Sequence, residues 1–277
     1  MRTHAIPVTV LILAASAAFP ARAWNDCEYR EPRNLDLAAD GVRTLVIRAQ
    51  AGDLAVRGGP GNTVAVRGEA CSSDADQLAS IRLVQSRSGD TLTVAVEMPE
   101  HSGWGNLQRA LDLDLTVPSR LAVRLQDSSG DVEVRGVASV TAEDSSGDLE
   151  IDAIAGDVEV RDSSGEIVVR DAGGNVRIPS DSSGDITVRG VLGSVSIEED
   201  SSGSITIAEV GGDARVDTDS SGDIEFERIT GSAEVGRDSS GAIEADDIGR
   251  DFVVRSDGSG GISHDRVRGR VDIPDQD

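Results

Sequence analysis

The stretch from residue 127 to the C-terminus contains one short motif eight times in register. The motif is Asp-Ser-Ser-Gly, or Asp-Gly-Ser-Gly in the last copy, and successive copies are spaced by 17, 18 and then five times 19 residues. A nearly fixed period of this length is the signature of a stacked array, in which each repeat packs only on its neighbours. The copies begin at Asp127, Asp144, Asp162, Asp181, Asp200, Asp219, Asp238 and Asp257.

The apolar residues of each copy follow the period of a β-strand. When the Asp is numbered position 1, positions 6 and 8 are apolar in nearly every copy, as are positions 15 and 17 in the longer copies. A spacing of two indicates a strand with one buried face. Position 11 is apolar between the two pairs. The copy that begins at Asp181 shows the full set: Ile186, Val188, Val191, Val195 and Ile197.

The turns complete a two-sided coil. Asp-Ser-Ser-Gly suits a type I turn in which the Asp accepts N–H groups of its own turn and the Gly takes the positive-φ position. A second glycine near position 13 marks the opposite turn. The predicted fold is therefore all-β, a parallel β-solenoid with two short strands per coil of about 19 residues, and the crossover rule favours a right-handed one. The second glycines are Gly156, Gly174, Gly193, Gly212 and Gly231.

Residues 24–126 lack the repeat and read as longer strands with alternating apolar residues. We expect this region to cap the open end of the solenoid of residues 127–277, which otherwise exposes strand edges. Residues 74–79 read as a helical turn, and residues 101–110 as a loop or short helix without a placed role. The expected strands are Thr44–Ile47, Leu54–Val56, Val64–Val66, Ile81–Val84, Thr91–Val96 and Leu111–Val117.

Residues 1–23 have the pattern of a secretory signal. Arg2 precedes an apolar run, and Ala21-Arg22-Ala23 predicts cleavage after Ala23. The run is short for a membrane span, and no other segment is predicted to span. We therefore expect an exported protein of the periplasm or the extracellular space.

The chain contains two cysteines, Cys27 and Cys71. An isolated pair in an oxidising compartment most often forms a disulfide. A zinc site is the weaker alternative, because two thiols without a neighbouring histidine lack the ligands of tetrahedral zinc.

Charge is divided unevenly along the chain. Residues 1–126 hold 14 acids and 13 arginines, a net charge of −1, whereas residues 127–277 hold 36 acids and 13 arginines, a net charge of −23. Nucleic acid and anionic membrane surfaces are therefore poor partners for the second half. An envelope protein or a glycan remains a candidate partner, and the sequence leaves the oligomeric state open.

The first-position aspartates are the sharpest candidate for a ligand site. Stacked at one-coil spacing, they would repel one another, and a bridging divalent cation such as Ca²⁺ would relieve that repulsion. The second acid of the turn, at position 5, is missing in three copies, which have Ser204, Ala242 and Gly261 there. Turn capping is therefore the preferred interpretation of the aspartates, and a cation ladder is the alternative.

Enzymatic constellations are weak. Of the three histidines, His4 lies in the signal, His101 in the unplaced segment and His264 near the end, where we expect a polar cap. Serine is a repeat residue here, so no Ser/His/Asp set can be argued from spacing. Trp24 and Trp104 could stack on sugar, although a lone Trp more often packs. The outward residues of the first strand, such as Asp131, Glu133 and Arg135, predict a solvated acidic face. The coils are also too short and uniform to favour the cleft of a carbohydrate-active β-helix enzyme.

The pattern resembles a known family. The run Leu111–Val117 with Pro118, then Leu121-Ala122-Val123 and the recurrent Ser-Gly-Asp-Ile-x-Val units are similar to the bacterial β-strand-repeat family called "putative adhesins", over about residues 40–275. The resemblance implies an exported parallel β-solenoid and brings no catalytic residues. We therefore expect a non-enzymatic envelope scaffold or adhesin-like binding module, with a Ca²⁺-stabilised surface module as the alternative and a carbohydrate-active enzyme as the second alternative.

Overall fold

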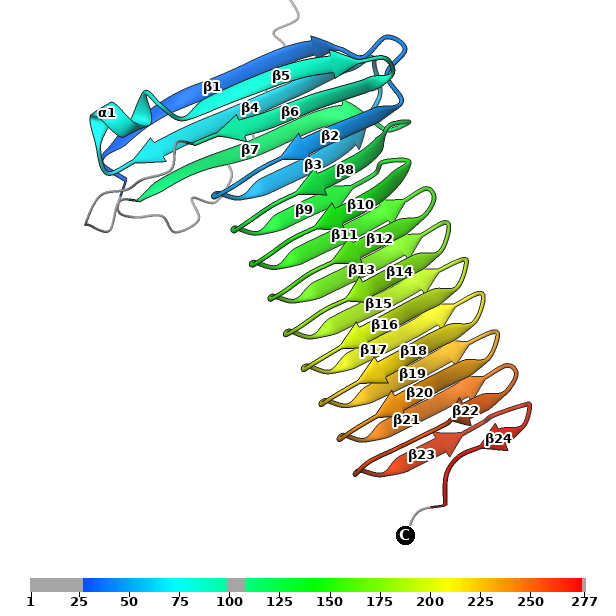
Figure 1. Cartoon of the computed structure of the whole chain (residues 1–277). Helices are drawn as coiled ribbons and strands as arrows, with labels where there is room; N and C mark the ends of the chain where they lie inside the picture. The colour runs from blue at the N-terminus through cyan, green and yellow to red at the C-terminus, as the bar shows by residue number, and fades with distance from the viewer. Residues whose placement is uncertain (1–26, 99–107, 276–277) are drawn as a thin grey trace, which may run out of the picture.

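A computed structural model of the chain describes residues 27–98 and 108–275. Within that part the strands form two sheets of twelve, which face each other along a rod (Figure 1). The predicted signal at residues 1–23, Trp24, His101 and Trp104 lie outside the described residues. We call the two layers sheet A and sheet B.

Each repeat contributes its first strand to sheet A and its second strand to sheet B. Equivalent positions of successive coils pair in parallel, as Ile186 does with Ile205 and Ile205 with Ile224. The structure therefore confirms the parallel β-solenoid. The sheet A strands are β9 (Val132–Arg135), β11 (Leu149–Ile154), β13 (Ile167–Ala172), β15 (Ile186–Val191), β17 (Ile205–Val210), β19 (Ile224–Ile229), β21 (Ile243–Ile248) and β23 (Ile262–Asp265). The sheet B strands are β8 (Ala122–Gln126), β10 (Ser139–Glu143), β12 (Val158–Arg161), β14 (Val176–Ser180), β16 (Val195–Asp200), β18 (Ala214–Asp219), β20 (Ala233–Asp238), β22 (Phe252–Val254) and β24 (Val271–Asp272).

The core is a stack of the predicted inward positions. In the coil that begins at Asp200, the side chains at positions 6, 8, 11, 15 and 17 are all buried. Each β-branched side chain stacks on a similar one from the next coil, which suits a narrow core between two sheets. Burying a side chain of this size stabilises the fold by about 1.5–3 kcal/mol. The five residues are Ile205, Ile207, Val210, Ala214 and Val216.

The two turns of a coil have their positive-φ residue at different positions of the repeat. At position 4 of each of the eight copies the glycine has positive φ, for example +128° at Gly203. At the opposite turn the positive-φ residue is at position 10, as in Glu209 with φ 58°. The position-13 glycines serve close stacking instead, because a Cβ on Gly193 would lie 2.5 Å from the carbonyl oxygen of Gly174.

The N-terminal region extends both sheets at one end of the rod (Figure 1). Strands β1 and β4 continue sheet A in antiparallel pairing beyond β7, and β5 continues sheet B beyond β6. The helical turn predicted at residues 74–79 contains α1 (Ala75–Leu78), whose N-cap is Asp74. Strand β1 was not predicted. The strands are β1 (Tyr29–Ala38), β2 (Thr44–Arg48), β3 (Leu54–Gly59), β4 (Thr63–Ser72), β5 (Arg82–Ser88), β6 (Thr91–Glu97) and β7 (Arg109–Pro118).

Strands β2 and β3 form a further coil that chain order conceals. Strand β3 pairs in parallel with β7 on one side and with β9 on the other, and β2 lies in the same way between β6 and β8. In chain order, β2 and β3 come first. Strands β6 and β7 then form the adjacent layer on the side away from the repeats, and β8 and β9 continue the solenoid on the other side. The turn of this layer is in register with the repeat turn, since Leu54 pairs with Val132.

Candidate functional site

The first-position aspartates form one column at the corner where sheet B leads into the first turn. We call Asp127, Asp144, Asp162, Asp181, Asp200, Asp219, Asp238 and Asp257 the aspartate column. Asp219 pairs in register with Asp200 and with Asp238, and β-bridges join Asp181 to Asp200 and Asp238 to Asp257. The first seven are at most 6% exposed, and Asp257 is half-buried. The column is therefore internal along almost its whole length.

Backbone N–H groups of the first turn donate hydrogen bonds to carboxyls of the column. The backbone N–H of Ser163 donates to Oδ1 of Asp162 at 2.7 Å, and Ser240 donates to Oδ1 of Asp238 at 3.1 Å. These are the contacts that the turn-capping interpretation predicts. At Asp127, where burial raises the carboxyl pKa, the N–H groups of Ser128 and Ser129 offset part of that rise without the geometry of a full hydrogen bond.

Many of the carboxyl oxygens in the column have no hydrogen-bond partner. Buried polar atoms are almost always paired, so a row of unpaired ones demands an explanation. Both oxygens are unpaired in Asp127, Asp144, Asp181 and Asp200, and one oxygen is unpaired in Asp162, Asp219, Asp238 and Asp257.

Burial and mutual repulsion raise the pKa values of the column. Burial, followed by the charge of Asp144, raises the pKa of Asp127 to about 7. Burial, followed by the charges of Asp219 and Asp181, raises the pKa of Asp200 to about 7. Burial is also the largest cause where the pKa rises to about 6, in Asp144, Asp181 and Asp219. Both causes disfavour the ionised form, so these carboxyls keep their protons to a higher pH than an exposed aspartate does.

The cation ladder remains a prediction. Within residues 27–98 and 108–275, no group of three or more His, Cys, Asp or Glu side chains is arranged to hold a metal ion. Successive aspartates of the column contribute one carboxyl per coil, whereas Ca²⁺ takes six to eight oxygen ligands.

The second acid of the turn has a structural task that the sequence reasoning missed. At position 5 the carboxyl accepts a hydrogen bond from the position-5 N–H of the next coil. Ser204 donates in this way to Oδ1 of Asp185 at 2.8 Å, and Ala242 to Oδ1 of Asp223 at 2.8 Å. Because the donor is a backbone group, the donating coil needs no acid of its own, which is why Ser204 and Ala242 are tolerated.

Two further ladders join the coils. At position 3 the serine hydroxyl donates to the position-2 carbonyl of the preceding coil, as Ser202 does to Ser182 at 3.2 Å. At position 14, in the opposite turn, a side-chain oxygen accepts from the next coil, as Asp213 does from the N–H of Ser232 at 2.8 Å. The signal for the second ladder was present in the sequence as a recurrent Asp, Asn or Ser after the position-13 glycine.

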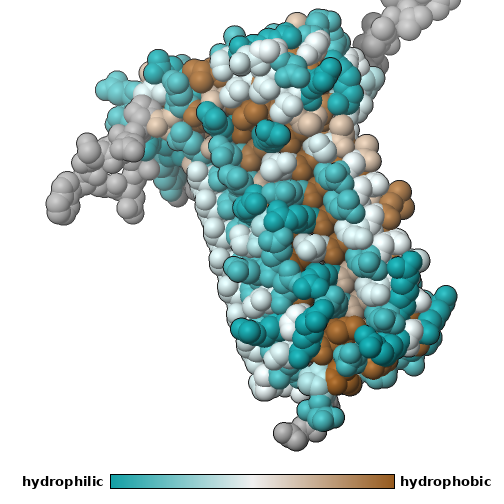
Figure 2. All heavy atoms as spheres, turned by 45° about the vertical axis from the view of Figure 1, so that its right-hand side comes forward, coloured by the Kyte–Doolittle hydropathy of each residue, from teal (hydrophilic) through white to brown (hydrophobic). Residues whose placement is uncertain are grey.

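The outward faces carry acids, many of which are paired with arginine. Arg135 contacts Asp152 at 2.7 Å, and Arg57 bridges Asp114 at 2.8 Å and Glu133 at 3.1 Å. Such exposed pairs contribute about 0–1 kcal/mol each. Figure 2 shows hydrophilic side chains over this face, with hydrophobic residues visible between them along the rod and a group of hydrophobic residues near its C-terminal end.

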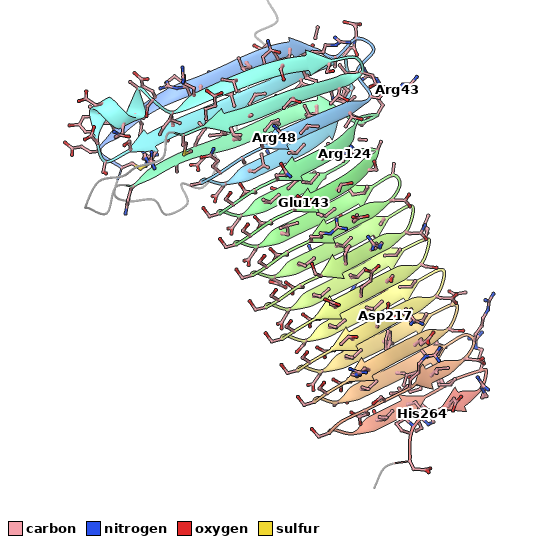
Figure 3. All side chains as sticks on the ribbon, in the orientation of Figure 1. Arg43, Arg48, Arg124, Glu143, Asp217 and His264 are labelled. Carbon is pink, nitrogen blue, oxygen red and sulfur yellow. A yellow bond between two sulfur atoms is a disulfide. The ribbon has the colours of Figure 1, made fainter. Side chains whose placement is uncertain are left out.

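Two arginines on sheet B lie outside these pairs. Arg48 on β2 and Arg124 on β8 extend from neighbouring strands, with Glu143 on the next strand, β10 (Figure 3). Glu143 accepts a hydrogen bond from Gln126 at 2.9 Å. Neither arginine forms an ion pair with another described residue.

Of the histidine and tryptophan candidates, only His264 lies within the described residues. His264 is exposed, and its ring centroid lies 6.1 Å from that of Phe252. His264 therefore packs over the last aromatic side chain of the core. The expected polar cap is present there, since Arg266 forms ion pairs with Asp246 and Asp265. In the described part of the chain, an open depression at the second turn is lined by Arg228, Ile229, Thr230, Asp247, Gly249 and Arg268.

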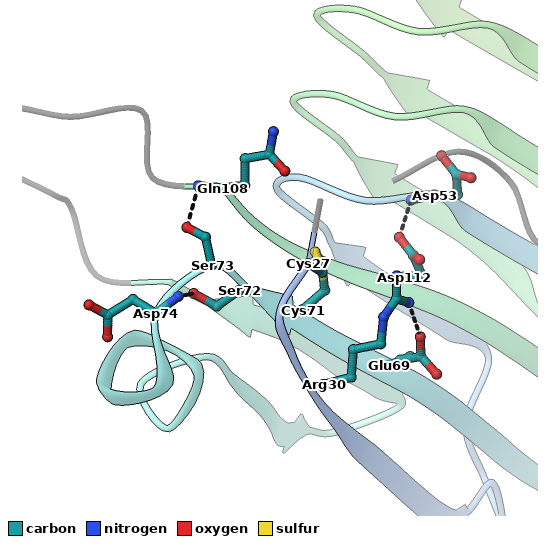
Figure 4. Close-up of a disulfide and its surroundings, with 10 residues drawn as sticks. All are labelled: Cys27, Arg30, Asp53, Glu69, Cys71, Ser72, Ser73, Asp74, Gln108 and Asp112. Carbon is teal, nitrogen blue, oxygen red and sulfur yellow. Dashed lines mark hydrogen bonds and ion pairs between the residues drawn. A yellow bond between two sulfur atoms is a disulfide. The ribbon is translucent and has the colours of Figure 1, made fainter. Parts of the chain in front are cut away.

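The predicted disulfide is present. Cys27 is bonded to Cys71 at the end of β4, with a Cα–Cα distance of 5.7 Å (Figure 4). Close by, Arg30 on β1 forms an ion pair with Glu69 on β4. Asp112 accepts a hydrogen bond from the N–H of Asp53 at 3.0 Å, which extends the position-5 ladder to β7.

Over the described residues, no helix is long and apolar enough to cross a membrane.

Comparisons with known proteins find a likeness in fold only. No family model and no curated protein matches the chain. Among solved structures it is similar to a putative adhesin from Bacteroides fragilis, with 12% identity, a TM-score of 0.39, and 90% of this chain and 99% of that chain covered. It is also similar to a putative lipid binding protein from Parabacteroides distasonis, with 15% identity, a TM-score of 0.38, and 88% and 97% covered. A putative cell adhesion protein from Clostridium sporogenes matches with 8% identity, a TM-score of 0.28, and 88% and 99% covered.

Proposed function

We propose that the protein is a non-enzymatic, exported scaffold of the cell envelope, an adhesin-like module that presents an acidic rod surface to a binding partner. The observation that carries the proposal is the uniformity of sheet A, where outward side chains of successive coils stand in register without an inserted loop from β9 to β23. A repeated surface favours a partner that is itself extended or repeated. The disulfide supports export, because disulfides persist in oxidising compartments.

The unpaired acids of sheet A are the part of this surface best suited to binding. Glu225 on β19 and Glu244 on β21 are directly opposite each other and exposed. Neither forms an ion pair with another described residue, so both carboxylates are available to a cationic group. Charge complementarity therefore favours a basic envelope protein or a glycan with cationic groups over nucleic acid.

The test is a pull-down from envelope extract with the mature chain, followed by binding to whole cells and to purified envelope fractions. We expect a partner that is retained by the native chain and weakened in the pair Glu225→Gln and Glu244→Gln. The matched control is Glu199→Gln with Asp275→Asn, which removes the same charge away from the face of sheet A. Equal binding by the two variants would place the partner elsewhere, and the absence of any retained partner would reject the binding function.

Calcium stabilisation is the second candidate, favoured by the unpaired oxygens of the aspartate column. A chelator distinguishes the two functions. We expect removal of divalent cations to shift the melting temperature by only a few degrees, whereas a Ca²⁺-dependent module would lose its fold.

A further inference from the structure

We propose that the aspartate column holds protons, each shared between the carboxyl groups of successive coils, so that acidification strengthens the rod. The inference is independent of any binding partner. It concerns seven side chains, from Asp127 to Asp238, which the turn chemistry uses only in part.

The geometry of the column supports proton sharing. Strands of a sheet lie about 4.8 Å apart, so carboxyls at equivalent positions of neighbouring coils approach within reach of each other. Asp200, Asp219 and Asp238 are in register, at most 2% exposed, and leave oxygens unpaired. A protonated carboxyl donates its O–H to a neighbouring carboxylate, which gives both groups a partner. Asp219 is in register with Asp200 on one side and with Asp238 on the other, so a proton on any of the three has a carboxylate next to it.

The charged groups that act most strongly on the column are themselves carboxyls. Along the column, Asp144 acts on Asp127, Asp162 on Asp181, Asp219 on Asp200, and Asp257 on Asp238. From the first turn of sheet A, the position-5 acids act from the side. These are Asp53 on Asp127, Asp131 on Asp144, Asp148 on Asp162, and Asp223 on Asp238.

From the turn itself come backbone N–H groups, which favour the ionised form only in part. Full ionisation would therefore leave stacked, buried charges without a counter-charge from any of these directions.

The sign of the pH dependence follows from the direction of the shifts. The pKa values of five column carboxyls lie at about 6 to 7, above the ordinary value of 3.8. The folded chain therefore holds these protons more tightly than the unfolded chain. The stability that they contribute is fully present below pH 3.8 and is lost as the pH rises through 6 and 7. Acidification from pH 8 to pH 5 should therefore raise the melting temperature.

The experiment is thermal unfolding of the mature chain between pH 5 and pH 8 in chelator. The test variant combines Asp144→Asn, Asp181→Asn and Asp219→Asn, which removes every second charge. Asn keeps an oxygen for the turn N–H groups and offers an N–H to the adjacent carboxylate. We expect this variant to melt at a higher temperature than the native chain at pH 8 and to lose more than half of the pH dependence.

The matched control combines Asp157→Asn, Asp213→Asn and Asp251→Asn. It removes the same charge at the opposite turn, at a position where Asn175 occurs naturally and accepts the same bond. We expect the control to keep the native pH dependence. A test variant that melts lower at pH 8, or a control that loses the same pH dependence, would overturn the proposal.

Two further measurements separate protons from cations and do not depend on a variant that folds. Carbon-detected nuclear magnetic resonance should show Asp127, Asp144, Asp181, Asp200 and Asp219 of the native chain titrating between about pH 6 and 7. Titration of these five carboxyls near pH 4 would overturn the proposal. Addition of Ca²⁺ at pH 8 should change the melting temperature by no more than a few degrees. A rise as large as that produced by acidification would identify the column as a cation site instead.

Discussion

Gly203 lies so close to Gly184 of the preceding coil that a Cβ on Gly203 would be 1.7 Å from the Gly184 carbonyl oxygen. The same contact recurs between Gly222 and Gly203 and between Gly241 and Gly222. Gly203 also has a φ of +128°, which side chains rarely adopt. The first turn therefore requires glycine for two separate reasons, its backbone conformation and its stacking distance.

Replacement of Gly203 by alanine should be among the most destabilising single changes in the rod. Backbone strain contributes about 1–3 kcal/mol, and the forced shift of packed coils contributes about 1–3 kcal/mol more. We expect Gly203→Ala to lower the free energy of unfolding by about 2–6 kcal/mol in urea denaturation, from these two causes together.

Two other glycines separate the causes. Gly61 has a φ of +111° with nothing within 4 Å of an added Cβ, so Gly61→Ala measures the backbone strain alone. Gly261 has open space around an added Cβ and a φ outside the left-handed region, so Gly261→Ala should be nearly neutral. If Gly203→Ala cost no more than Gly61→Ala, the stacking contact would not limit this turn.

The position-5 ladder predicts a difference between two substitutions of Asp185. Asp185→Ala removes the acceptor of the Ser204 N–H, whereas Asp185→Asn keeps an oxygen there. We expect Asp185→Ala to cost about 0.5–1.5 kcal/mol and Asp185→Asn to cost less than half as much. Amide hydrogen exchange at Ser204 should accelerate only in Asp185→Ala. Equal effects of the two substitutions would mean that charge, not the hydrogen bond, is what Asp185 supplies.

The repeat predicted the architecture because every coil solves the same packing problem. The spacing of Ile205, Ile207 and Val210 is set by which side chains enter the core, and all three are buried as expected. The coil of β2 and β3 was missed because it lacks the first-position aspartate. Ala49 stands at that position, next to Asp127 of the following coil. Its turn, Ala51-Gly52-Asp53-Leu54, repeats the Ser-Gly-Asp-apolar pattern and was the available signal.

Burial of the aspartates could not be read from the sequence. Strand alternation from the inward Ile197 would place Glu199 inside and Asp200 outside. In the structure Glu198 and Glu199 are both on the outer side, and Asp200 returns to the interior. The irregularity lies in the backbone at the corner of the coil, where period-two reasoning ends. Turn chemistry identified the acceptor role of the aspartate but not the side of the chain on which it lies.

The core should respond to the balance of size between Phe226 and Ala245. These residues are directly opposite each other on β19 and β21, and both are buried. We expect Phe226→Ala to cost about 3–5 kcal/mol through the cavity that it leaves. Ala245→Phe should cost about 1–3 kcal/mol through overpacking.

The double variant tests the coupling of these two sites in urea denaturation. Because the added ring can fill part of the vacated space, we expect the double variant to be more stable than the sum of the single effects predicts. Strict additivity would show that the two layers pack independently.

The disulfide should stabilise the N-terminal strands rather than the repeats. It joins residues 44 apart and fixes the beginning of β1 against the end of β4. The loop-closure model gives about 3–4 kcal/mol for a link of this length. We expect Cys27→Ser with Cys71→Ser to lose that amount in urea denaturation, and hydrogen exchange to accelerate in β1 and α1 while β15 to β21 stay protected. Reductant should reproduce the effect in the native chain and leave the double serine variant unchanged. If exchange in the repeats accelerated equally, the two ends of the rod would unfold as one cooperative unit, and the disulfide would stabilise the whole solenoid.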